Sequence, residues 1–95
     1  MTLKDIFHEF NRINMFINQG IIEIPMGKLY SIYNMHPGEA YCNILNTFGW
    51  DVLLGETPKR EVLEKAYSDL ETYYKESKVK ELKEPLQHFK EYLGI

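Results

Sequence analysis

The chain has 95 residues, of which 44% are hydrophobic and 26% are charged, and its formal net charge at pH 7 is −3. This length suits one domain with one core, and the single cysteine, Cys42, excludes an intrachain disulfide. A small negative charge argues against a general phosphate binder. Because the chain has neither a run of about 18 apolar residues nor a signal-peptide pattern, we expect one cytoplasmic domain over 1–95.

The charged side chains are spread unevenly. Residues 1–50 carry seven of the Lys, Arg, Asp and Glu side chains, and residues 51–95 carry the other 18. The net charges of the two halves are −1 and −2, so the halves differ in charge density and not in sign. The first half is therefore expected to present an unusually uncharged surface.

The chain begins with a predicted helix over 2–18, where apolar residues recur at helical spacing. Thr2 is a suitable N-cap, and Gly20 is a natural C-terminal stop because glycine accepts left-handed backbone angles. The β-branched run "IIEI" at 21–24 ends at Pro25. Its shortness favours an extended connector over an edge strand.

Two further helices are predicted around a Pro-Gly pair. The first covers Met26 to Met35 and must end there, because Pro37 disfavours helical geometry at His36. Pro37 then suits the first turn of the next helix, where its missing N–H costs nothing. That helix is expected to run from Gly38 to Phe48 and to stop at Gly49.

The second half predicts an antiparallel pair of charged amphipathic helices. Thr57 and Pro58 are expected to start the first of them, as cap and first residue. Ser77 can cap the second, which ends at Gly94, and Pro85 predicts either a kink or a restart within it. The fold class is therefore all-α, a compact bundle of about five short helices that ends in this hairpin.

The Pro-Gly bend raises the alternative of a helix-turn-helix that reads DNA. Asparagine can pair with adenine, so base reading is chemically open. However, the second helix has no Lys or Arg, and phosphate neutralisation supplies most non-specific DNA affinity. A bend between bundle helices is the favoured interpretation. The outward candidates on the second helix are Glu39, Asn43, Asn46 and Thr47.

No pattern predicts catalysis, a cofactor or a metal site. Cys42 lies on the apolar side of its helix and suits a buried thiol. Glu84, His88 and Glu91 share one helical face, which leaves a weak alternative of an enzyme with a metal site. One histidine with two glutamates is a small and common ligand set, so a solvated face is the favoured interpretation. We expect no enzyme activity.

The remaining feature is a concentration of aromatic and methionine residues in the uncharged half. Protein interfaces favour Tyr, Trp and Met and disfavour Lys and Glu at their centres. The predicted partner-binding residues are Met26, Tyr30, Tyr33, Met35, Tyr41 and Trp50. These residues predict a non-catalytic module that binds another protein, or a second copy of itself as a homodimer.

The expected role is that of an inhibitor, adaptor or regulator, with a transcriptional regulator as the alternative. The charge grounds above argue against nucleic acid as a partner. Lysine outnumbers arginine nine to two, and Ile, Asn and Tyr are abundant, as in low-GC genomes. This composition and the small size suggest a phage or mobile-element product that captures a host protein.

Overall fold

The computed structural model describes all 95 residues and contains five α-helices and one short 3-10 helix, with no strand. This confirms the predicted all-α fold. The elements are α1 (Leu3–Asn18), α2 (Met26–Tyr33), α3 (Pro37–Leu53), α4 (Arg60–Ser77), η1 (Lys80–Leu82) and α5 (Lys83–Leu93). None of the helices combines the length and apolar character that crossing a membrane requires.

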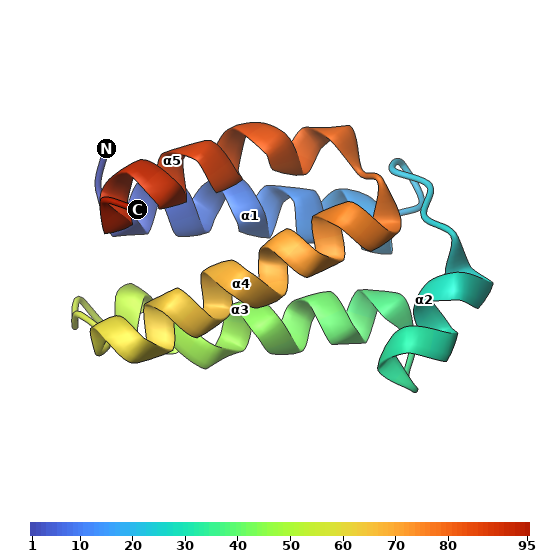
Figure 1. Ribbon diagram of the computed structural model, residues 1–95, viewed down its shortest axis with the longest axis horizontal. Coiled ribbons are helices and arrows are strands. Elements are labelled where there is room, and N and C mark those ends of the chain that lie inside the picture. Colours follow the sequence, from blue (N-terminus) through green and yellow to red (C-terminus); the bar gives the residue numbers. More distant parts are fainter.

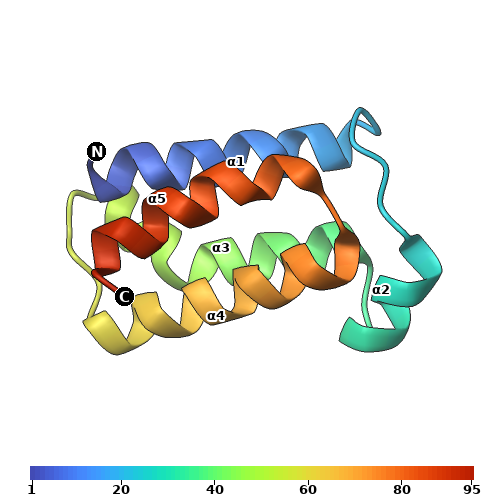
Figure 2. The ribbon, with the colours of Figure 1, turned by 45° about the horizontal axis from the view of Figure 1, so that its top comes forward.

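The four long helices form an antiparallel bundle, and α2 lies across one of its ends (Figure 1). In Figure 2, α5 lies beside α1, and α4 lies beside α3. The α1–α3 and α4–α5 pairs complete the bundle, so each long helix contacts two neighbours. The two chain ends and the α3–α4 connection share the end of the bundle opposite α2 (Figure 1).

Several predicted helix boundaries are confirmed by local hydrogen bonds. Thr2 forms a capping box with Asp5, in which each backbone N–H donates to the other side chain over 3.2 Å. Pro37 is the first residue of α3, and the Nδ1 atom of His36 accepts from the Gly38 N–H at 3.0 Å. Gly94 ends α5 with a left-handed φ of 71°.

The predicted stop at Gly49 is wrong, because α3 continues to Leu53. Gly49 is buried against the Phe7 ring, and an added Cβ would lie 2.9 Å from its Cζ. The glycine therefore allows α1 and α3 to approach closely. The chain turns away only at Gly55, where φ is +83°.

The second half also differs from its prediction at the helix starts. Thr57 and Pro58 do not begin α4; Lys59 is the extended cap residue, and its carbonyl accepts from Val62 and Leu63. Pro58 is buried instead. The second helix is a restart and not a kink, because Pro85 is the third residue of α5, where a backbone N–H has no partner within the helix.

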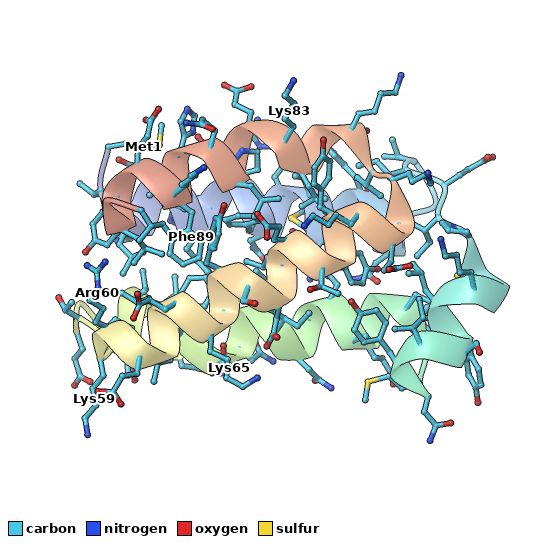
Figure 3. All side chains as sticks on the ribbon, in the orientation of Figure 1. Met1, Lys59, Arg60, Lys65, Lys83 and Phe89 are labelled. Carbon is cyan, nitrogen blue, oxygen red and sulfur yellow. The ribbon has the colours of Figure 1, made fainter.

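One hydrophobic core of 23 buried residues runs through the bundle. Within it, the Phe89 ring of α5 contacts rings from the three other long helices. Figure 3 shows Phe89 between α5 and α4. The centroid distances are 5.9 Å to Phe10, 5.6 Å to Phe48 and 5.7 Å to Tyr67. Edge-to-face and tilted contacts of this kind add about 0.5–1.5 kcal/mol each beyond area burial.

Candidate interaction surface

The predicted partner-binding residues do not form one surface. Met26, Tyr30 and Tyr33 belong to α2, and Met35 follows in the α2–α3 turn. Trp50 lies in the last turn of α3, 13 residues beyond its start, which is about 20 Å along the helix. Because α2 packs at the opposite end of the bundle, Trp50 belongs to a different surface (Figure 1).

Tyr41 is a core residue, and its assignment to the surface is wrong. The side chain is fully buried, and its hydroxyl donates to the Phe10 carbonyl at 2.7 Å. Burial raises the pKa of Tyr41 well above the ordinary value. Tyrosine has a large apolar ring and one polar atom, so sequence alone does not distinguish a satisfied core tyrosine from an interface tyrosine.

Tyr33 and Met35 are half-buried in the notch where α2 meets α3 and α4. They help to line an apolar hollow of about 290 Å³, together with Ala40, Ile44 and Asp69 among others. The Tyr33 ring lies 5.6 Å from that of Tyr73, and its shielded hydroxyl has no hydrogen-bond partner. Burial raises its pKa, as do the charges of Asp69 and Glu76.

Helix α2 is unusual because almost all of it faces water. Leu29 is its only buried residue, although five of its eight residues are apolar or aromatic. Met26, Tyr30 and Ile32 are 44%, 57% and 45% exposed. We name these three residues the α2 surface. A single ion pair, Lys28 Nζ to Glu76 Oε2 at 3.4 Å, joins α2 to α4.

A second exposed apolar set lies at the C-terminal end of α3. Leu54 is 74% exposed, and Leu53 and Trp50 are also exposed. Sequence reasoning missed the two leucines because it ended the helix at Gly49. The signal was present, since Trp50, Leu53 and Leu54 follow the i, i+3, i+4 spacing of one helical face.

Exposed apolar side chains are concentrated in the first part of the chain. Of the 11 large hydrophobic residues exposed to water, nine precede residue 55. The nine are Met1, Met15, Ile21, Met26, Tyr30, Ile32, Trp50, Leu53 and Leu54. The hairpin contributes only Tyr92 and Ile95, near its end.

The outward face of α3 carries the residues considered for DNA reading. Glu39, Asn43, Asn46 and Thr47 are all exposed. Helix α3 contains no lysine or arginine, and its only Asp and Glu residues are Glu39 and Asp51. This helix therefore has no cation that could neutralise a DNA phosphate.

The residues considered for metal or nucleophilic chemistry do not assemble into a site. No three His, Cys, Asp or Glu side chains lie close enough to hold a metal ion. His88 instead pairs across the bundle with Glu9, its Nδ1 atom 2.9 Å from Oε2. Cys42 is half-buried, and its Sγ atom accepts a hydrogen bond from the Asn46 amide at 3.7 Å.

Comparison of the chain with protein-family models, with curated proteins and with solved structures gives no match. The functional interpretation therefore depends on the geometry described above. The feature with the clearest physical consequence is the exposed apolar character of α2, because water solvates such surface poorly.

Proposed function

We propose that this chain is a small cytoplasmic, non-catalytic module that binds another protein through the α2 surface. The observation that supports the proposal is the exposure of Met26, Tyr30 and Ile32 on a helix with one buried residue. Such a helix buries little apolar surface against the rest of the protein, so its exposed apolar side chains are available to a partner.

The surroundings of α2 suit a helix-in-groove or helix-on-surface contact. Interface centres favour Tyr and Met, and few charged residues interrupt the first half of the chain. The neighbouring hollow at Tyr33 and Met35 offers about 290 Å³, which is enough for one large apolar side chain of a partner. The role that fits these features is an inhibitor, adaptor or regulator. An origin on a phage or mobile element stays a prediction.

The test is a pull-down from a lysate of the cells that encode the chain, with nuclease added. The tagged natural chain is compared with Tyr30→Ser/Ile32→Ser and with the control Tyr92→Ser, which changes an exposed residue of the hairpin. We expect one stoichiometric protein that the natural chain and the control retain and the double variant loses. Circular dichroism checks that all three chains are folded.

Two results would contradict the proposal. Retention of the same protein by Tyr30→Ser/Ile32→Ser would show that α2 is not the contact surface. Loss of the retained protein on nuclease treatment would mean that nucleic acid bridges it to the chain.

A further inference from the structure

The α4–α5 side of the bundle carries a groove lined with lysine. Two hollows of about 200 and 290 Å³ adjoin there, and both are lined by Tyr74 and Lys75. Five of the chain's 11 basic side chains contribute to them. We name this feature the lysine groove, and its lysines are Lys75, Lys78, Lys80, Lys83 and Lys90.

Four of the five lysines form no direct ion pair within the protein, although Lys80 and Lys83 also adjoin Glu81, Glu84 and Glu91. Glu71 is the only carboxylate that lines the groove, and it pairs with Lys75 at 3.6 Å. The other four lysines take part in none of the ion pairs of the structure. Figure 3 shows one of them, Lys83, projecting from α5 into solvent. Lysine side chains are long and flexible, so their ammonium groups can converge on a ligand in the groove.

The charges around α5 are unevenly distributed between its two flanks. On the flank toward α1, Glu81 and Glu84 share a hollow with Glu9, and Arg12 is the one cation there. Lys75, Lys83 and Lys90 line the flank toward α4, and Lys80 and Lys83 also border a hollow that holds Glu81, Glu84 and Glu91. The lysine groove itself is lined by five lysines and one glutamate, so the expectation from the net charge of −3, that the chain does not bind phosphates, does not extend to it.

The walls of the lysine groove include fixed aromatic rings. Tyr67 packs edge-on against Phe89 at 5.7 Å, and its hydroxyl donates to Glu71 at 3.2 Å. Tyr74 is half-buried against the core and lines both hollows. The groove thus combines flexible cationic side chains with two aromatic side chains that pack against the core.

We propose that the lysine groove binds single-stranded nucleic acid, with lysines at the phosphates and Tyr74 against a base. Proteins that bind single strands without sequence preference combine a basic groove with aromatic contacts to bases. Lysine suits this task because it acts as a point charge and imposes no paired geometry on its ligand.

Two other polyanions fit the groove less well. An acidic peptide would engage the lysines but offer no flat face to Tyr74. An anionic membrane would also need apolar side chains to insert, and none of the exposed large hydrophobic residues lies between residues 55 and 91. The proposal does not depend on the α2 surface.

The test measures the anisotropy of a labelled oligothymidylate of about 20 nucleotides at several salt concentrations. The variant is Lys78→Gln/Lys80→Gln/Lys83→Gln, which removes three unpaired cations from the groove. Each single-strand phosphate contact contributes about 0.7 to the slope of log affinity against log salt. Loss of three contacts should make this negative slope shallower by about 2 and should weaken the affinity in about 0.1 M salt by about 100-fold.

The matched control is Lys4→Gln/Lys59→Gln/Lys65→Gln, which changes the net charge equally with exposed residues outside the groove. We expect it to keep its affinity within about threefold, since distant exposed charges are screened. Absence of binding by the natural chain, or equal weakening by both triple variants, would overturn the proposal. So would tighter binding of a duplex of the same length, or competition by polyglutamate as effective as that by unlabelled oligothymidylate.

Discussion

Helices α1 to α3 and the α4–α5 hairpin share one core but present different surfaces to water. Inward, both parts supply apolar residues, and Phe89 of the hairpin meets Phe10 and Phe48 of the first part. Outward, the first part has most of the exposed large hydrophobic residues, and the hairpin has most of the charges. The difference therefore arises at the surface and not in the packing.

This contrast shows which residues are free to serve a partner. A core position is constrained by volume and burial, whichever part of the chain supplies it. An exposed Met26 or Tyr30 has no such constraint, and its apolar side chain contributes little to folding. Surface composition is thus the better guide to function in this molecule.

The largest effect is expected from two tyrosines of the first part that sequence reasoning treated alike. Tyr41→Ala should lower the free energy of unfolding by about 3–5 kcal/mol, because it empties a core site and leaves the Phe10 carbonyl without this donor. Tyr30→Ala should change it by less than about 0.5 kcal/mol. Urea unfolding followed by circular dichroism measures both. Similar losses in the two variants would show that α2 is as much a core element as α3.

A smaller effect on stability is expected from alanine at two helical glycines of the first part, Gly49 in α3 and Gly27 in α2. Gly49→Ala should destabilise the protein by about 1–3 kcal/mol, because the new Cβ would overlap the Phe7 ring. Gly27→Ala meets no atom within 4 Å and should stabilise α2 by up to about 1 kcal/mol. Thermal melts of the two variants show whether each change raises or lowers the stability of the protein. If Gly49→Ala stabilised the protein, α1 and α3 would be able to move apart without loss of stability.

The His88–Glu9 pair links the two parts and makes stability depend on pH. The hydrogen bond to Glu9 raises the pKa of His88, desolvation opposes it, and the charges of Glu9, Glu84 and Glu91 add to the increase. Because the pKa of His88 is higher in the folded state, the protonated pair stabilises the fold. This stabilisation is complete below the pKa of the unfolded state, near 6.5, and is lost as the pH rises through the pKa of the folded state.

The side chains of His88 and Glu9 are 25% and 23% exposed, so the pH-dependent contribution should be less than about 1 kcal/mol. Stability from urea unfolding at pH 5.5 to 8.5 should therefore fall slightly in the natural chain and should not show this fall in His88→Gln. An equal fall in both chains would assign the pH dependence to other groups.

The smallest effect is expected on the outer face of the hairpin. Lys65 pairs with Asp69 at 3.2 Å, one helical turn away, and the lysine side chain is 78% exposed. Lys65→Gln should lower stability by about 0.3–0.5 kcal/mol, and about 1 M salt should remove the difference. A loss above about 1 kcal/mol would show that the charged surface supports the fold directly.

Helix existence and type could be predicted from the sequence because they depend on neighbours along the chain. The Thr2 cap, the start at Pro37 and the stop at Gly94 follow from backbone chemistry within a few residues. The continuation of α3 through Gly49 could not be predicted, since that glycine makes room for the Phe7 ring, 42 residues earlier in the sequence.

The candidate surface was harder to predict than the fold. Whether a tyrosine points inward depends on which helices pack together, and Tyr41 and Tyr30 have the same sequence signal. Trp50 is separated from α2 by the length of α3, because α2 adjoins the start of α3 and Trp50 lies 13 residues beyond that start. The gathering of five lysines around two adjoining hollows is likewise a result of how α4 and α5 pack, and composition does not predict it.

The position of Phe89 has a consequence for how the chain acquires its structure during synthesis. Its ring joins α1, α3 and α4, yet it leaves the ribosome after all three of those helices. Until then Phe10, Phe48 and Tyr67 have no common partner, and the growing chain exposes them. Docking of α5 should therefore close the core late and in one cooperative step, and a nascent chain stalled before residue 89 should remain sensitive to protease along its whole length.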